Sequence, residues 1–168
     1  MASTKYQYFS FLFLLLTVPI LASATTCDKA DKSALFAIKS ELNNPPGLSS
    51  WSSNTLCCTW NEIHCDSTTG RVTALTIFGL NVSVPIPPSI AKLTALQTLN
   101  LPYDQLYGPI PPFLSLLPEL TFLRLDGNML TGSIPPTLTL LLDPLLVGNR
   151  LTGHFLPPLQ KQILLLGI

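Results

Sequence analysis

The chain has 168 residues, which suits one small domain, and its nine basic residues balance its nine acidic residues. Only 11% of the residues are charged, where soluble domains carry about 25%, so an apolar segment must inflate the average. The sequence contains no basic stripe that could bind a phosphate backbone, which argues against nucleic acid as a partner.

The N-terminal segment has the organisation of a secretion signal. Lys5 precedes an apolar run from Phe9 to Leu21, and Ala22-Ser23-Ala24 supplies the small residues that signal peptidase requires. A retained membrane helix is the alternative, but the run is short for a bilayer and contains Pro19. We therefore expect residues 1–24 to be cleaved and the protein to be secreted, with no membrane span in the mature chain. Removal of Lys5 leaves eight basic against nine acidic residues, a net charge near −1.

The four cysteines are expected to be oxidised in a secreted protein; they are Cys27, Cys57, Cys58 and Cys65. The adjacent Cys57 and Cys58 can hardly bridge each other without strain, so two pairings remain, and both tie Cys27 to the adjacent pair. A zinc site is the alternative, but the spacing has no paired C-x-x-C, and His64 points away from Cys65 if that segment is extended. We expect two disulfides at one end of the molecule, and no metal or cofactor.

Residues 25–68 are predicted to form an N-terminal cap. Leu35, Ile38 and Leu42 recur at helical spacing after Asp28 and Asp31, which predicts an amphipathic helix over residues 28–42. Two prolines and a glycine within residues 43–53 then end the helix. Such an atypical segment would cover the apolar end of a repeat array.

The next segment, residues 69–140, repeats with a period of 24 residues. Leu75, Leu99 and Leu123 lie 24 residues apart, and Ile-Pro-Pro recurs at 86–88, 110–112 and 134–136. Residues 93–116 and 117–140 are identical at 11 of 24 positions, all of them expected to point inward or form turns. This period predicts an α/β leucine-rich-repeat solenoid of three coils, with short parallel strands on a concave face.

Each coil should begin with a strand of the form L-x-L, whose leucines point inward and whose middle residue points outward. The turn that follows favours asparagine, whose amide can satisfy backbone groups. Asn128 and Asn149 hold that position, Asp104 can do part of the task, and Leu80 cannot. The glycines that follow, Gly108 and Gly132, permit backbone angles closed to other residues, and Ile-Pro-Pro is expected to form a stiff, extended back.

Residues 141–168 are predicted to be a degenerate fourth repeat followed by an uncapped tail. Pro144 falls where a strand leucine would stand, so we expect that strand to be spoiled. Two interpretations remain open, namely an unusual last turn and a truncated or frame-shifted tail.

The run LPELTFLRLDGNMLTGSIP at residues 117–135 resembles the plant-specific class of extracellular leucine-rich repeats. The helical cap, the segment LCCTWNEIHCD at residues 56–66 and the runs around Ile-Pro-Pro further resemble the polygalacturonase-inhibiting proteins of plant cell walls. The resemblance covers roughly residues 1–140. It implies the pairings Cys27–Cys57 and Cys58–Cys65, a role in plant defence, and binding of a pectin-degrading polygalacturonase on the concave sheet. Members of the family continue for several more coils.

The outward residues of the expected strands are the candidate protein-binding surface, because Tyr, Phe and Arg on a rigid sheet tend to dominate binding energy. The alternative is that the phenylalanines lean on neighbours and that Arg124 pairs with Asp126. The candidate residues are Thr76, Phe78, Asn100, Pro102, Tyr103, Phe122, Arg124 and Asp126.

One N-x-S/T sequon occurs, at Asn81-Val82-Ser83, and we expect Asn81 to be glycosylated in a secreted protein. Catalysis has little support, because His64 and His154 have no free nucleophile nearby and the carboxylates are scattered singly. The chain is therefore expected to be a recognition module and not an enzyme. A shortened product of a longer inhibitor or receptor ectodomain, without activity of its own, is the alternative.

Overall fold

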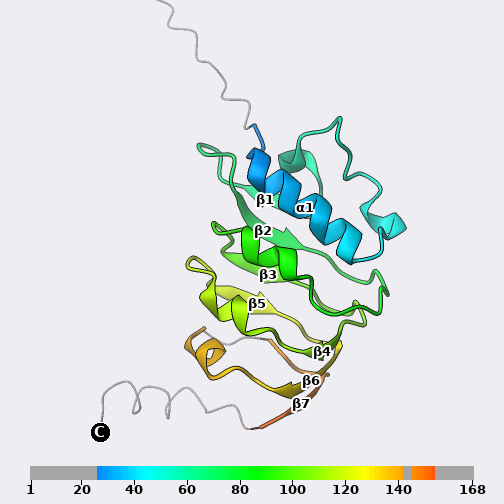
Figure 1. Cartoon of the computed structure of the whole chain (residues 1–168), viewed down its shortest axis with the longest axis vertical. Helices are drawn as coiled ribbons and strands as arrows, with labels where there is room; N and C mark the ends of the chain where they lie inside the picture. Colours follow the sequence, from blue (N-terminus) through cyan, green and yellow to red (C-terminus); the bar gives the residue numbers. More distant parts are fainter. Residues whose placement is uncertain (1–25, 142–144, 154–168) are drawn as a thin grey trace, which may run out of the picture.

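A computed structural model describes residues 26–141 and 145–153 of the protein. The expected signal peptide, residues 1–24, and His154 with the rest of the expected tail lie outside these ranges, as does Pro144. The described residues form a right-angled stack of coils beneath a helical cap, in which α1 and the shorter helices lie above one another in the same order as the strands (Figure 1).

The cap contains the expected helix, α1 (Lys29–Glu41). Asp28 caps its first turn, since its side chain accepts hydrogen bonds from the backbone N–H groups of Ala30 and Asp31 at 2.9 and 3.0 Å. Leu35 and Ile38 are fully buried and pack the helix against the coils. Two 3₁₀ helices complete the cap, η1 (Pro46–Leu48) and η2 (Cys57–Thr59).

A four-stranded sheet in the order β1-β2-β3-β5 forms the concave face. Its strands are β1 (Ile63–Cys65), β2 (Val72–Thr76), β3 (Thr98–Asn100) and β5 (Phe122–Arg124). Strand β1 runs antiparallel to β2, while the other neighbours are parallel. Leu75 pairs with Leu99, and Leu99 with Leu123, so the 24-residue period is the register of the sheet. This confirms the predicted α/β leucine-rich-repeat fold.

A second parallel sheet, which the sequence analysis did not anticipate, has the order β4-β6-β7. It consists of β4 (Tyr107–Pro109), β6 (Met129–Ser133) and β7 (Arg150–Thr152). Gly108 and Gly132 lie in this sheet with φ of +79° and +76°, left-handed angles that favour glycine, as the sequence predicts.

The prediction of an extended back at each Ile-Pro-Pro is wrong for the second proline. Pro88, Pro112 and Pro136 each begin a 3₁₀ helix, whose bounds are η3 (Pro88–Lys92), η4 (Pro112–Leu116) and η5 (Pro136–Leu140). The first proline of each pair is extended, but the fixed φ of the second suits the first position of a helix, where no N–H is needed.

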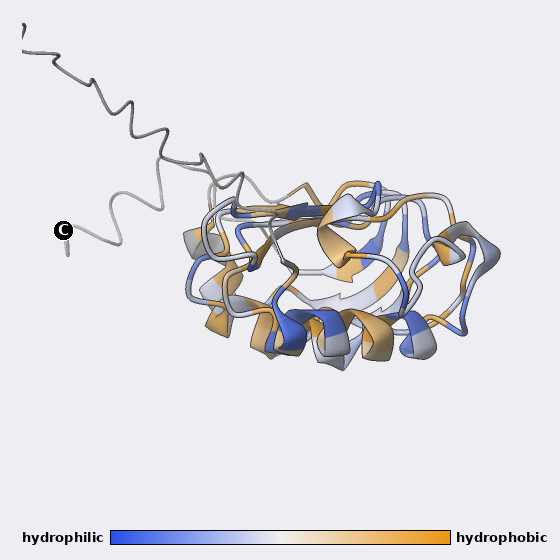
Figure 2. Cartoon of the chain, turned by 90° about the horizontal axis from the view of Figure 1, so that it is seen from above, coloured by the Kyte–Doolittle hydropathy of each residue, from blue (hydrophilic) through white to orange (hydrophobic). Residues whose placement is uncertain are grey.

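The interior of the stack is filled by the repeated leucines. Leu75 and Leu99 are fully buried and Leu123 is 1% exposed. Seen along the stack, the coils superpose as loops, with α1 and the shorter helices gathered along one side (Figure 2). None of the helices in the described ranges has the length and apolarity to span a bilayer.

The asparagine turns join each coil to its neighbour. Asn128 Oδ1 accepts from the N–H groups of Asp104 and Leu106, and its Nδ2 donates to the carbonyls of Leu101 and Leu125, at 2.7 to 3.1 Å. Asn149 repeats the arrangement one coil later, with Nδ2 donating to the Leu125 carbonyl at 2.8 Å. The side chain therefore ties a turn to its own coil and to the coil before it.

The fourth coil continues the concave ladder, although its sequence predicts a spoiled strand. Leu145 forms a parallel bridge with Arg124, and the Leu125 N–H donates to the Leu145 carbonyl at 2.8 Å. Leu146 is buried in the core. The pairing is reduced to this single bridge, so no regular strand forms there.

Candidate functional site

One row of outward side chains crosses the concave sheet from the cap to the third coil. Thr76 pairs with Asn100, and Asn100 with Arg124, so these residues point to the same face. The Thr76 N–H donates to the carbonyl of Glu62 at 2.8 Å, which places Glu62 opposite Thr76 at the cap end. We call Glu62, Thr76, Asn100 and Arg124 the central row.

Glu62 is a member of this row that the sequence analysis missed. Its side-chain Oε2 accepts a hydrogen bond at 3.0 Å from Nε1 of Trp51, which is 2% exposed. A weak signal was present, because Glu62 precedes the buried Ile63 and so alternates to the outer face once the segment is known to be a strand.

Three aromatic side chains border the central row and are exposed. Phe78 is 71% exposed, Tyr103 55% and Phe122 39%. The alternative that the two phenylalanines simply lean on neighbours does not account for such exposure, least of all for Phe78. Large exposed aromatic groups on a rigid sheet are typical of binding surfaces.

Arg124 forms an ion pair with Asp126, the alternative considered for these two residues. The distances are 2.6 Å from Nε to Oδ1 and 3.3 Å from Nη2 to Oδ2. The hydrogen bond from Arg124 lowers the pKa of Asp126, and the bond to Asp126 raises the pKa of Arg124. Because the pair is partly exposed, its contribution to stability is below about 1 kcal/mol. The pair fixes the guanidinium at the far end of the central row.

The prediction that Pro102 offers an exposed surface is wrong, because Pro102 is buried. The register extended from Asn100 places Pro102 between Phe78 and Asp126 of the adjacent coils. Its short ring lies lower than these longer side chains. Pro102 can support the aromatic border but cannot contact a partner directly.

Tyr103 occupies a backbone position that glycine holds in the other coils. Its φ is +58°, and the corresponding Gly79, Gly127 and Gly148 have φ of +71°, +67° and +73°. Its ring lies against Gly127, where an added Cβ would be 2.3 Å from Cδ1 of Tyr103. A left-handed conformation costs an L-residue about 1–2 kcal/mol, so an exposed tyrosine here is an exception worth a functional explanation.

The sequon lies at the rim of the concave face. Asn81 is exposed, with a φ of +53°, and its Oδ1 accepts from Gln105 Nε2 at 2.8 Å. Its Nδ2, the atom that a glycan would join, makes no hydrogen bond with the described part of the chain. Ser83 Oγ donates to Gln105 Oε1 at 3.0 Å, so one glutamine holds both sequon side chains.

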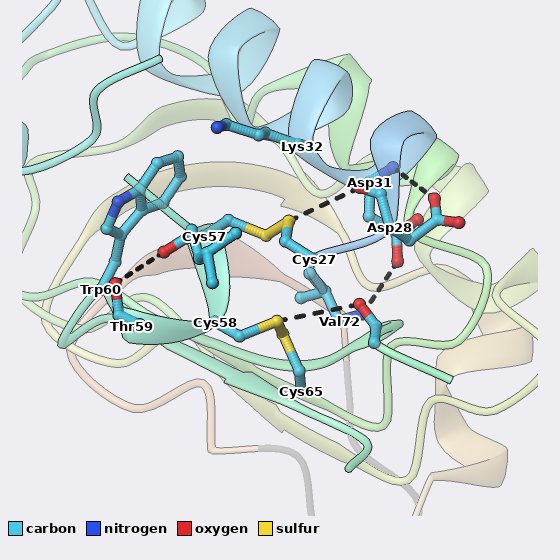
Figure 3. The surroundings of a disulfide bond; sticks show 12 residues. Cys27, Asp28, Asp31, Lys32, Cys57, Cys58, Thr59, Trp60, Cys65 and Val72 are labelled. Atoms are coloured by element: carbon cyan, nitrogen blue, oxygen red, sulfur yellow. Dashed lines mark hydrogen bonds between the residues drawn. A yellow bond between two sulfur atoms is a disulfide. The ribbon is translucent and has the colours of Figure 1, made fainter. Parts of the chain in front are cut away.

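The four cysteines form the disulfides Cys27–Cys57 and Cys58–Cys65, the pairing that the resemblance implies. Both lie beside the start of α1, close to Trp60 (Figure 3). The sulfurs of Cys27, Cys57 and Cys58 lie within 4.8 Å of one another, but the bonds leave no thiolate to bind a metal.

Comparisons with known proteins agree with this geometry. The leucine rich repeat N-terminal domain matches residues 28–66, and the leucine rich repeat matches residues 119–141. A polygalacturonase inhibitor from Vitis vinifera is 43% identical over 52% of this chain and 26% of its own length. Polygalacturonase inhibitor 1 from Arabidopsis thaliana is 44% identical over 53% of this chain and 27% of its own length.

These matches confirm the resemblance to polygalacturonase inhibitors, and the chain spans about a quarter of the length of these relatives. Among solved structures, the leucine-rich-repeat ectodomain of the receptor kinase SOBIR1 from Arabidopsis thaliana superposes with a TM-score of 0.63, at 28% identity, over 81% of this chain and 77% of that one. A plant ice-binding protein superposes with a TM-score of 0.57, at 33% identity, over 77% of this chain and 51% of that one.

Proposed function

Because the chain has the leucine-rich-repeat fold and resembles plant polygalacturonase inhibitors, we propose that it is a secreted recognition module of the plant cell wall, acting in defence. Its partner would be a fungal polygalacturonase, which it would inhibit by covering the substrate cleft and not by chemistry. The observation that carries the proposal is the exposed aromatic border, Phe78, Tyr103 and Phe122, beside the central row.

The size of this surface limits the expected affinity. A standard protein interface buries about 800 Å² on each partner. Three short parallel strands and the edge of the cap offer a small patch, so the aromatic side chains must supply most of the binding energy. We therefore expect binding to be weak and to depend strongly on these few residues.

The test uses the secreted, purified chain and a panel of fungal polygalacturonases. Binding is measured on an immobilised chain, and inhibition by the release of reducing sugars from pectin. We expect Phe78→Ala and Tyr103→Ala each to weaken binding by about 10-fold or more. Leu116→Ala is the matched control, because Leu116 is 77% exposed but lies on η4, away from the concave sheet. No bound enzyme and no lost activity would contradict the proposal.

We also propose that Asn81 carries an N-linked glycan. The exposed side chain and the unengaged Nδ2 support it. The secreted chain should lose mass on treatment with a peptide N-glycosidase, and Ser83→Ala should have the lower mass from the start. An unchanged mass for the wild-type chain would contradict this assignment.

A further inference from the structure

A groove of about 360 Å³ lies where the cap meets the first coil, beside the central row. Glu62 and Thr76 line it from the sheet, and Phe78 lines it from the end of the strand. Asn61, Gly47 and Leu80 complete its walls. The groove is open to solvent on the concave side, because Phe78 and Asn61 are exposed.

The charge in this groove is uncompensated. Glu62 is half-buried, and neither of the ion pairs formed by the described residues includes it. The bond from Trp51 holds Oε2, while Oε1 accepts no hydrogen bond from the described part of the chain. A carboxylate held by a buried indole, with one oxygen unengaged, is oriented in advance for a cationic group.

The other walls suit the same kind of ligand. The exposed ring of Phe78 offers a π face, which attracts a lysine ammonium or an arginine guanidinium. The Thr76 hydroxyl and the Asn61 amide can accept further hydrogen bonds, and no lysine or arginine lines the groove. Carboxylate, aromatic ring and neutral acceptors together are complementary to a long basic side chain.

We propose that this groove binds a lysine or arginine side chain presented by the protein partner, with Glu62 as the residue that selects it. The inference rests on the proposed function, since it names the chemistry by which the concave face would recognise a protein. At the opposite end of the central row, Arg124 is neutralised by Asp126, so Glu62 supplies the unpaired charge of the row.

The direct test follows the indole N–H resonance of Trp51 by NMR, because this group donates to Glu62. The secreted chain is titrated with N-acetyl-arginine amide to about 100 mM, and with the neutral analogue N-acetyl-citrulline amide. We expect a saturable shift with the arginine probe only. The shift should vanish in Glu62→Gln, which keeps an acceptor for Trp51 but loses the charge, and persist in the control Glu119→Gln. Equal shifts with both probes, a shift that survives Glu62→Gln, or no shift would overturn the proposal.

A second measurement separates this inference from the proposed function. If a polygalacturonase binds, Glu62→Gln should weaken its affinity by about 10-fold and Glu119→Gln should not. Unchanged affinity in Glu62→Gln would overturn the inference while the proposed function stands. If no polygalacturonase binds, the proposed function fails, and the probe titration still decides whether the groove selects a cation.

Discussion

Asp104 stands in the second coil where asparagine stands in the third and fourth. It is 1% exposed, and its Oδ1 accepts from the Leu80 N–H at 2.7 Å. Its Oδ2 is buried without a hydrogen-bond partner, whereas the matching Nδ2 of Asn128 donates to backbone carbonyls. Burial raises the pKa of Asp104, and the bond from Leu80 opposes that rise. A protonated Asp104 would resemble the asparagine that it replaces.

Asp104→Asn should therefore stabilise the protein at neutral pH. The raised pKa means that the contribution of Asp104 to stability is full below its unfolded pKa and is lost as pH rises through its folded pKa. Asparagine supplies the missing donor, so we expect a gain of about 1–3 kcal/mol near pH 7 and a smaller gain near pH 4. Urea denaturation at both values measures it.

The control for this prediction is Asp126→Asn, at a residue whose pKa is lowered. There the contribution to stability is present above the unfolded pKa and is lost as pH falls, so the pH dependence should change in the opposite sense. An Asp104→Asn variant with the same gain at both pH values would contradict the role given to the proton.

At the scale of elements, a buried carboxylate joins α1 to the first coil. Asp31 is fully buried and accepts from Arg71 Nε at 2.8 Å, from Arg71 Nη2 at 3.1 Å and from the Val72 N–H at 2.8 Å. Its bond is the leading cause of the raised pKa of Arg71. The helix is thus tied by one side chain to the start of β2.

Asp31→Ala should separate these elements at a cost of about 2–4 kcal/mol. The estimate lies below that for a fully buried ion pair because the Arg71 side chain is 32% exposed. Asp28→Ala, which removes only the helix cap, should cost about 0.5–2 kcal/mol. Thermal unfolding of both variants gives the comparison, and equal losses would show that the tie to β2 contributes little.

The two disulfides of the cap should differ in their contribution to stability. Cys27–Cys57 closes 30 residues and Cys58–Cys65 closes seven. Loop-closure entropy then predicts losses of about 3.5 and about 2.5 kcal/mol when each pair is replaced by serine. Urea midpoints of the two double variants test the order, and a larger loss for the shorter loop would contradict the entropic account.

Sequence alone predicts the elements that repeat and fails at those that do not. Leu75, Leu99 and Leu123 encode the register because a parallel stack repeats its contacts at a fixed step. Glu62 escaped notice because β1 joins the sheet in the antiparallel sense, from a cap without periodicity. The burial of Pro102 depends on the heights of its neighbours, and the Asp31–Arg71 bond spans 40 residues. No local pattern specifies either.

At the scale of the whole molecule, the stack has one continuous core that extends from the cap to the fourth coil. Its middle is better covered than its last coil, since Leu99 is fully buried and Leu151 is half-buried. Each coil contacts its neighbours, so stability depends on the interfaces between coils.

Leu99→Ala should therefore be far more damaging than Leu151→Ala. We expect losses of about 2–5 kcal/mol for the first and less than half of that for the second. Native-state hydrogen exchange should show lowered protection on β2, β3 and β5 in Leu99→Ala, and near β7 alone in Leu151→Ala. Similar, localised losses in both variants would contradict a single cooperative core.

The asparagine joints give the architecture the character of interchangeable bricks. Asn128 engages its predecessor almost entirely through main-chain atoms, which any coil of the same geometry presents. A duplicate of residues 117–140 inserted before Leu117 would meet compatible joints on both sides. The engineered protein would gain one more rung, and its gripping face would widen without any change in the chemistry of the original rungs.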